Sequence, residues 1–289
     1  MSPFDLDDAA AYARWRDAKL AGHPGTVGEL LVELDDPTAP GTTERAALAE
    51  RLGRCNMAVF SAPWALLDRE GVRRLGAQVG LHRLDQHLCA GEDAVSALTV
   101  ADDALHAGYI PYTHRPIAWH TDGYYNPPEH QIRGLLLYSV RPAREGGTNQ
   151  LLDHEIAYLL LRDRDPALVR ALMHPAAMCI PPNRVDGEEL RPEVCGPVFS
   201  VDAAGHLHMR YTARRRNIRW RDDPATHAAV AALAEILAGP SPWHFAYRLA
   251  AGQGLICNNV LHTRSGFEAD SARLLYRARY YDRVALGTL

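Results

Sequence analysis

The sequence predicts a mainly β protein with flanking helices, built around an antiparallel core such as a jelly roll. Beyond residue 95, short runs rich in branched and aromatic residues alternate with Pro, Gly and Asn, the spacing of an antiparallel all-β fold. The earlier residues instead place apolar side chains at helical spacing. With 289 residues, 47% of them hydrophobic, the chain can bury one large core. We therefore expect a single domain over 1–289, with a mostly helical covering segment at 1–94 and the core at 95–285.

The covering segment combines helix formers with stretches that open on Asp or Thr, residues that cap helix N-termini. One short apolar run has the length of a strand and is closed by Pro63. The expected helices are 7–19, 26–34, 43–52 and 68–84, and the expected strand is 57–60.

The core segment contains strand-like runs separated by turn residues, interrupted by two helical regions. Asp153 is placed to cap the first helical region, and the second is rich in Ala. The expected strands are 109–112, 117–119, 134–140, 198–201, 206–211, 244–249, 254–258 and 273–281, and the expected helices are 156–161, 166–173 and 224–237.

Charge and hydropathy exclude several classes of partner. The formal net charge is −4 and no long run of Lys or Arg occurs, so we expect neither nucleic acid nor an anionic membrane as a partner. The N-terminus is acidic and lacks an apolar leader, and no later segment is apolar for the length of a membrane span. We expect a soluble, cytoplasmic protein. A homo-oligomer is compatible with this reading, because such folds often bury helices at interfaces.

The cysteines predict no disulfide framework and no cysteine zinc site. They are odd in number and widely spaced, without a CxxC pair. We expect reduced and mostly buried thiols at Cys55, Cys89, Cys179, Cys195 and Cys257.

A His-x-Asp pair, His120 and Asp122, follows one of the strand-like runs. In an extended chain, residues two apart point to the same side, so both side chains can face one metal ion. Two imidazoles and one carboxylate suit iron(II) and leave three coordination positions open. A lone His-x-Asp pair is also common as an ordinary hydrogen-bonded pair, so further residues must support the interpretation.

The supporting residues lie near the C-terminus. A turn, a buried strand and an Asn-Asn step lead to His262, an arrangement suited to delivering a third ligand from a loop. In the strand-like run that follows, period-two geometry places Arg273, Arg277 and Arg279 on one face with Leu275. Buried arginines are costly unless anions pair with them, and a guanidinium offers a bidentate fork to a carboxylate.

These segments resemble the taurine dioxygenase/TfdA family of iron(II)/2-oxoglutarate oxygenases. The family pattern is a His-x-Asp pair, a distal His about 140 residues later and an Arg eleven residues beyond that His. His120, Asp122, His262 and Arg273 meet it. The resemblance covers roughly 95–285 and implies a double-stranded β-helix, or cupin-like jelly roll, as the core.

The resemblance also implies roles for residues around the iron ligands. Thr148, after the Gly146-Gly147 step, stands where the family places a threonine on the co-substrate carboxylate, and Arg277 stands where some members bind an anionic group of the substrate. Two features fit less closely: Asn258 replaces a usual Asp, and Arg264, two residues after His262, is similar to the clavaminate synthase-like branch.

The resemblance implies an iron(II)- and 2-oxoglutarate-dependent dioxygenase. It would use O2 to hydroxylate an unactivated C–H bond of a small carboxylate- or sulfonate-bearing metabolite, releasing succinate and CO2. His120, Asp122 and His262 would be the catalytic metal ligands, and Arg273 and Thr148 would bind 2-oxoglutarate. The expected substrate contacts are Arg277, Tyr124, Asn126 and Arg210.

Two alternatives remain open at this stage. A metal hydrolase could use the same three ligands with bound water as nucleophile, although Arg273 and Thr148 would then have no purpose. A cupin-like sensor could bind 2-oxoglutarate and metal without turnover. A zinc-protease motif is absent, because His154-Glu155 is not followed by a second His four residues after the first.

Overall fold

The computed structural model describes residues 2–62, 67–86, 93–101, 109–185, 188–214, 216 and 218–286. The chain forms two compact units, each assembled from separate stretches. The first unit comprises Met1–His23, Trp119–Gln131 and Leu152–His244, and the second comprises Pro24–Ala118, Ile132–Leu151 and Phe245–Leu289. The expected single domain stays a prediction.

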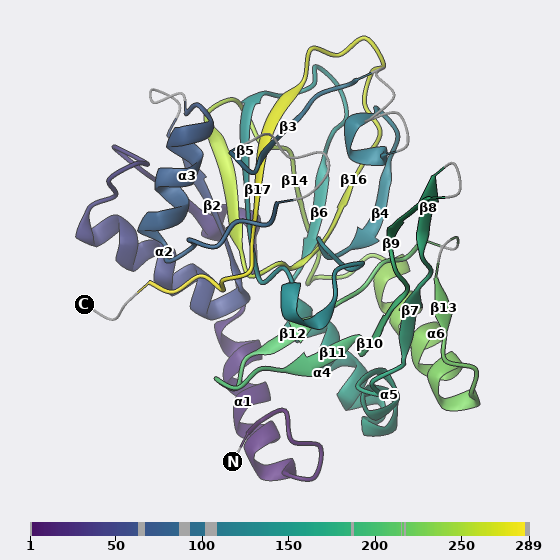
Figure 1. Cartoon of the computed structure of the whole chain (residues 1–289). Coiled ribbons are helices and arrows are strands. Elements are labelled where there is room, and N and C mark those ends of the chain that lie inside the picture. The colour runs from purple at the N-terminus through teal and green to yellow at the C-terminus, as the bar shows by residue number, and fades with distance from the viewer. Residues whose placement is uncertain are drawn as a thin grey trace. The chain divides into compact units, whose positions relative to one another are not determined.

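The second unit contains a six-stranded sheet in the order β1-β2-β15-β5-β17-β3, of which β2, β5, β17 and β3 are labelled in Figure 1. All neighbours pair antiparallel except β1 and β2, which are parallel. The strands are β1 (Leu31–Glu33), β2 (Met57–Ser61), β15 (Gln253–Cys257), β5 (Gly134–Arg141), β17 (Leu274–Tyr280) and β3 (Val95–Leu98).

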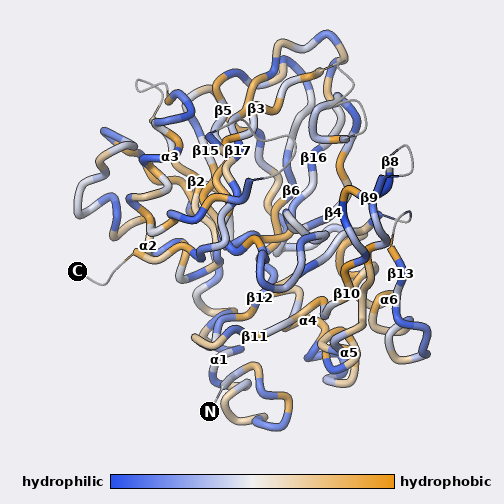
Figure 2. The backbone as a smooth tube through the Cα atoms, in the orientation of Figure 1, coloured by the Kyte–Doolittle hydropathy of each residue, from blue (hydrophilic) through white to orange (hydrophobic). Residues whose placement is uncertain are grey.

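Both faces of this sheet are covered by apolar side chains. Alternate residues of β15 enter different clusters: Ile256 packs with Phe60 and Tyr138, whereas Leu255 packs with other side chains on the opposite face. Figure 2, coloured by hydropathy, shows hydrophobic residues in orange along β2 and β15. Burial on both faces explains why these strands appear in the sequence as nearly continuous apolar runs.

A second sheet of this unit places β14 (Phe245–Tyr247), β6 (Asn149–Leu152) and β16 (Leu261–Arg264) side by side, in that order. β4 (Ile117–His120) begins in the second unit and ends in the first. The helices of the second unit include α2 (Thr42–Cys55) and α3 (Arg69–Gln78). The helices expected at 43–52 and 68–84 are confirmed, although the second is shorter than predicted.

Two expected elements of the second unit are wrong. Residues 26–34 form a 3-10 helix, η1 (Val27–Leu30), followed by β1, because Glu29 accepts backbone hydrogen bonds from Gly25 and Thr26 while the next residues pair with β2. Residues 109–112 form a 3-10 helix, η2 (Ile110–Tyr112), because a proline in the first turn fixes φ and lacks the N–H that a central strand needs.

The first unit contains smaller sheets and most of the longer helices. Its helices are α1 (Ala9–Gly22), α4 (His154–Arg164), α5 (Pro166–Leu172) and α6 (Pro224–Ala238), and α4, α5 and α6 pack against one another. Asp8, Asp153, Asp165 and Asp223 cap them as expected of Asp. Its strands are β7 (Met178–Ile180), β8 (Asn183–Val185), β9 (Glu188–Arg191), β10 (Val194–Gly196), β11 (Phe199–Val201), β12 (Leu207–Met209) and β13 (Arg219–Trp220), paired as β10-β7-β13, β11-β12 and β8-β9.

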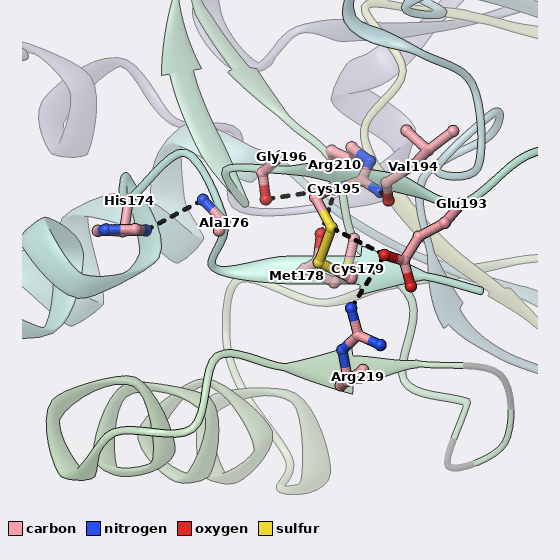
Figure 3. Close-up of a disulfide and its surroundings, with 10 residues drawn as sticks. All are labelled: His174, Ala176, Met178, Cys179, Glu193, Val194, Cys195, Gly196, Arg210 and Arg219. Atoms are coloured by element: carbon pink, nitrogen blue, oxygen red, sulfur yellow. Dashed lines mark hydrogen bonds and ion pairs between the residues drawn. A yellow bond between two sulfur atoms is a disulfide. The ribbon is translucent and has the colours of Figure 1, made fainter.

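A disulfide joins Cys179 on β7 to Cys195 on β10 (Figure 3), so the expectation of reduced thiols is wrong for these two residues. They are directly opposite each other in the antiparallel register, with their Cα atoms 4.0 Å apart. Strand register, not sequence spacing, brings them together. Cys55 and Cys257 carry buried thiols as predicted, and Cys89 lies outside the described residues.

No helix among the described residues combines the length and the apolar character needed to cross a bilayer.

Candidate functional site

His120 and Asp122 lie close together in the first unit, both buried. His120 ends β4, and its Nε2 atom is 3.5 Å from Oδ1 of Asp122. The backbone between them is fixed on the residues after β12: Thr121 donates its N–H to the carbonyl of Tyr211, and Tyr211 donates its N–H to the hydroxyl of Thr121. The same-side geometry expected of a His-x-Asp pair is therefore present.

The loop after Asp122 turns sharply. Gly123 has φ +66°, a conformation that suits glycine, and the Asn126 N–H donates to the carbonyl of Gly123. The Asn126 side chain donates to the carbonyl of His130. These hydrogen bonds of Asn126 stabilise the loop. Its expected role in substrate binding stays a prediction.

Two arginines from other parts of the first unit lie beside the tyrosines of the same loop. The rings of Tyr124 and Tyr125 pack edge to face at 5.3 Å. The guanidinium of Arg191 lies 5.9 Å from the Tyr125 ring centroid, and Arg214 Nη1 is 3.4 Å from the Tyr124 hydroxyl. These contacts hold the two arginine side chains beside the tyrosine rings.

Arg210, one of the expected substrate contacts, is surrounded by backbone carbonyls of the first unit. Its Nε donates to the carbonyl of Tyr124, its Nη1 to those of Met178 and Gly196, and its Nη2 to that of Val194. Burial, and secondarily the positive charge of Arg191, lower its pKa to about 10. A guanidinium committed to four backbone carbonyls has a structural role, and the expected role of Arg210 as a substrate contact stays a prediction that these contacts do not support.

His262 lies on β16 in the second unit and is buried. Its Nδ1 is 3.0 Å from the carbonyl of Val260. A carbonyl only accepts, so Nδ1 carries the proton and the lone pair of the ring resides on Nε2, the tautomer that a metal ligand needs.

The Asn-Asn step before His262 builds the turn that precedes β16. Asn259 adopts a left-handed conformation with φ +51° and donates its side-chain N–H to the carbonyl of Ile132. The Asn258 side chain donates to Asn56 and accepts from the N–H of Val284. Asn at the position of the usual acidic residue therefore serves as both donor and acceptor here.

Thr148 follows a turn of two glycines at φ +70° and +67°. Gly146 must lack a side chain, because a Cβ there would lie 2.1 Å from the carbonyl oxygen of Gly266. The backbone of Thr148 exchanges hydrogen bonds with Ser265, donating to its hydroxyl and accepting from its N–H. The turn is thus fixed beside the residues that follow β16.

Glu268 anchors the same turn, and no pattern in the sequence singled it out. Its carboxylate accepts the N–H groups of Arg144 and Glu145 at 2.7 and 3.2 Å. Desolvation raises the pKa of Glu268, but these and other hydrogen bonds outweigh it and lower the pKa to about 2. The contact spans more than a hundred residues of sequence, which explains why local patterns did not reveal it.

Arg273 is buried directly before β17 and faces a small pocket of the second unit. Its guanidinium lies 5.0 Å from the ring centroid of Phe267, and its Nε is 3.7 Å from where a Cβ of Gly147 would stand. Burial lowers its pKa to about 10. Among the described residues, no side chain or carbonyl accepts a hydrogen bond from this guanidinium. The pocket is lined by Pro142, Ala143, Gly147, Asn149, Arg248, Leu249, Arg273 and Leu275.

Three further buried arginines of the second unit differ in their partners. Arg279 pairs with Asp85, which also accepts the hydroxyl of Tyr281. Arg264 donates to backbone carbonyls including those of Pro111 and Thr113, and its pKa falls to about 9 through burial and then through the charges of Arg273 and Arg277. Arg277 is buried on β17. The second unit thus concentrates positive charge around Arg273.

Comparison with known families decides the assignment. The sequence profile of the family described as Taurine catabolism dioxygenase TauD, TfdA family matches residues 16–279. The chain belongs to the TauD/TfdA family. The predicted family is confirmed, and the match reaches further toward the N-terminus than the segment 95–285 that carried the resemblance.

Two curated relatives are similar in sequence to this TauD/TfdA chain. Both are named uridine-5'-phosphate dioxygenase: one from Amycolatopsis sp is 34% identical over 172 residues, and one from Streptomyces sp is 31% identical over 188 residues. The matches cover 56% and 63% of this chain, and the chain spans only 60% and 66% of the relatives' own lengths.

One solved structure of similar fold is that of an asparagine oxygenase in complex with Fe(II), 2S,3S-3-hydroxyasparagine and succinate. It superposes with a TM-score of 0.58 at 15% identity, covering 95% of this chain and 84% of that one. This likeness shows the fold, and the predicted mainly β class with a double-stranded β-helix core and flanking helices is confirmed.

Proposed function

We propose that this TauD/TfdA protein is an iron(II)- and 2-oxoglutarate-dependent dioxygenase. One observation of the structure carries the proposal: the buried guanidinium of Arg273, which faces a pocket and lacks an acceptor among the described residues, lies against the glycine turn that ends at Thr148. A buried cation without a protein acceptor is stabilised by an anionic ligand. The far carboxylate of 2-oxoglutarate supplies that anion.

His120, Asp122 and His262 would hold the iron. Their donor set of two imidazoles and one carboxylate suits iron(II). Local contacts orient His120 and Asp122 within the first unit and His262 within the second. His120 Nε2 lies beside the Asp122 carboxylate, and His262 keeps its lone pair on Nε2 because Nδ1 is bonded to Val260. When bound, iron with 2-oxoglutarate and O2 supplies the oxidising chemistry that hydroxylates a C–H bond and releases succinate and CO2.

Arg273 and Thr148 would bind and orient 2-oxoglutarate. The Arg273 fork is suited to a bidentate contact with the far carboxylate, and its packing on Phe267 fixes the plane of the guanidinium. The Thr148 hydroxyl would add a hydrogen bond to the same carboxylate. Ser265 and Glu268 keep the Thr148 turn in place through backbone contacts.

The substrate would be a small anionic metabolite, with a nucleoside 5'-monophosphate as the first candidate. The names of the two relatives support uridine 5'-phosphate, which carries a phosphate where we had expected a carboxylate or sulfonate. Tyr124 and Tyr125 offer aromatic faces to a base, and Arg214 beside them offers charge to a phosphate. Arg277 would be a further anion contact.

Succinate formation tests this function. The purified protein, supplied with iron(II), ascorbate, 2-oxoglutarate and air, should release succinate in step with consumption of uridine 5'-phosphate, and faster than with a sulfonate such as taurine. His262→Ala should abolish the reaction, whereas Arg74→Gln, a change of an exposed side chain on α3, should leave it intact. Succinate release driven by the sulfonate and not by the nucleotide would overturn the substrate assignment. No succinate with any small anion would overturn the dioxygenase.

A further inference from the structure

A second structural link reaches the loop that carries Asp122, and it begins at the disulfide. The strands β7 and β10 pair antiparallel, with Met178 opposite Gly196 and Cys179 opposite Cys195. The disulfide therefore covalently locks the register between these two strands. Figure 3 shows the sulfur bridge with the Arg210 guanidinium beside it.

Arg210 donates hydrogen bonds to carbonyls on both of these strands. Three of its four carbonyl partners are neighbours of the bridged cysteines: Met178 precedes Cys179, while Val194 and Gly196 flank Cys195. The carbonyls of Met178 and Gly196 converge on the same nitrogen, Nη1, at 2.9 and 3.4 Å. A slip between β7 and β10 would separate these carbonyls, so the position of the guanidinium depends on the pairing that the disulfide fixes.

The fourth carbonyl belongs to the metal-ligand loop. Arg210 Nε donates at 2.7 Å to the carbonyl of Tyr124, two residues after Asp122. The turn at Gly123 separates this anchor from the Asp122 carboxylate. Arg210 therefore connects the bridged strands to the loop whose conformation sets where that carboxylate points.

The disulfide lies where a reductant can reach one of its sulfurs. Cys179 is buried, but Cys195 is only half-buried, and its Sγ is 3.8 Å from Oε1 of the exposed Glu193. Arg219, also exposed, pairs with Glu193 at 3.0 Å along the same edge. Disulfides that are open to attack by thiols are the ones that act as redox-sensitive groups.

We propose that the Cys179–Cys195 disulfide and Arg210 form a redox-sensitive clamp on the loop that carries Asp122, with Arg210 as its positioning residue. Reduction is a two-electron exchange with an external dithiol. A thiolate of the dithiol attacks Cys195 Sγ, the S–S bond breaks, and Cys179 leaves as a thiolate and takes up a proton. The second thiol then resolves the mixed disulfide, which releases the Cys195 thiol and leaves the reductant oxidised. The role in metal binding rests on the proposed function, whereas the clamp itself does not.

Hydrogen exchange of the metal-free protein tests the clamp independently of activity. Mass spectrometry of oxidised protein and of protein treated with a phosphine reductant first establishes that the bridge forms and opens. Amides of 119–131, including the Thr121 N–H bonded to Tyr211, should then exchange several-fold faster in the reduced protein. Exchange of 119–131 that is unchanged on reduction, or a bridge that does not form under oxidising conditions, would overturn the proposal.

Variants distinguish an effect of the clamp on 119–131 from a general destabilisation of the protein. A Cys179→Ser/Cys195→Ser protein should exchange like reduced wild type and ignore the reductant, and Arg210→Lys should exchange fast at 119–131 in both redox states. Arg219→Gln, which alters only the exposed edge, should respond to reductant as wild type does. Because the reduced wild-type protein is itself a test, failure of the double variant to fold does not remove the evidence.

Iron(II) affinity distinguishes this proposal from the proposed function. Loss of a group that supports metal ligands typically weakens binding by roughly 10- to 100-fold, and we expect reduction to weaken iron(II) binding by about 10-fold. Faster exchange with weaker iron binding supports both. Faster exchange in a protein that binds no iron in either state supports the clamp and contradicts the proposed function.

Discussion

Two buried arginines, one in each unit, show how partners determine the role of a charge. Arg210 and Arg273 are each 4% exposed, and burial lowers the pKa of each to about 10. Arg210 donates to four backbone carbonyls, whereas the guanidinium of Arg273 has an aromatic ring beside it and no acceptor among the described residues. Burial and a shifted pKa therefore do not separate a ligand-binding arginine from a structural one. The acceptors around the guanidinium do.

Removing the Arg273 guanidinium should give the largest effect. Arg273→Gln leaves the far carboxylate of 2-oxoglutarate without its charged partner, and loss of a buried charge pair of this kind costs on the order of 100-fold in affinity. Anaerobic titration of the iron protein with 2-oxoglutarate measures it, and iron affinity should be nearly unchanged. Arg74→Gln is the matched control, because that side chain is exposed on α3 and pairs with the exposed Glu70. Equal 2-oxoglutarate affinity in wild type and Arg273→Gln would refute the assignment.

Replacing Arg210, the structural arginine of the pair, should weaken iron(II) binding but not 2-oxoglutarate binding. Arg210→Lys keeps the charge but loses the planar fork that reaches several carbonyls, so iron(II) affinity should fall by roughly 10-fold. The 2-oxoglutarate concentration needed for half-saturation at saturating iron should stay the same. An increase confined to the KM for the anionic substrate would instead restore Arg210 as a substrate contact.

Replacing Glu268 should lower 2-oxoglutarate affinity by an intermediate amount, because Glu268 holds the Thr148 turn in place. Glu268→Gln weakens the contacts to the N–H groups of Arg144 and Glu145, and we expect 2-oxoglutarate affinity to fall about fivefold, the scale of one lost hydrogen bond.

The same carboxylate gives a pH dependence with a defined sign. The pKa of Glu268 is lowered from 4.5 to about 2, so its contribution to stability is complete above pH 4.5 and is lost as the pH falls toward 2. The difference in melting temperature between wild type and Glu268→Gln should therefore be constant near neutral pH and narrow over that acidic range. A difference that stays constant to pH 2 would contradict the assigned hydrogen bonds.

Phe267 should give the smallest effect. Phe267→Leu removes the ring at 5.0 Å from the Arg273 guanidinium but keeps an apolar wall, and a cation–π contact contributes about 0.5–1 kcal/mol, or about two- to fivefold in 2-oxoglutarate affinity. Isothermal titration should resolve the change. A loss as large as that of Arg273→Gln would mean that the ring, not the charge, organises the pocket.

Local patterns predicted what depends on neighbours in sequence. The His120-x-Asp122 spacing, the Asp caps and the alternation of β17 side chains between two apolar clusters are all short-range signals, and the structure contains each of them. The role of Arg210 was not predictable in this way, since its acceptors lie between 14 and 86 residues away. The Cys179–Cys195 bridge likewise depends on strand register. Long-range partners decide whether a polar residue in the sequence serves the fold or a ligand.

The most direct test of the central claim is anaerobic absorption spectroscopy of the protein with iron(II) and 2-oxoglutarate. We predict a weak visible charge-transfer band in the wild-type protein that is absent in His262→Ala and needs far more 2-oxoglutarate in Arg273→Gln. Iron that binds to the wild-type protein without producing this band at any 2-oxoglutarate concentration would contradict the account.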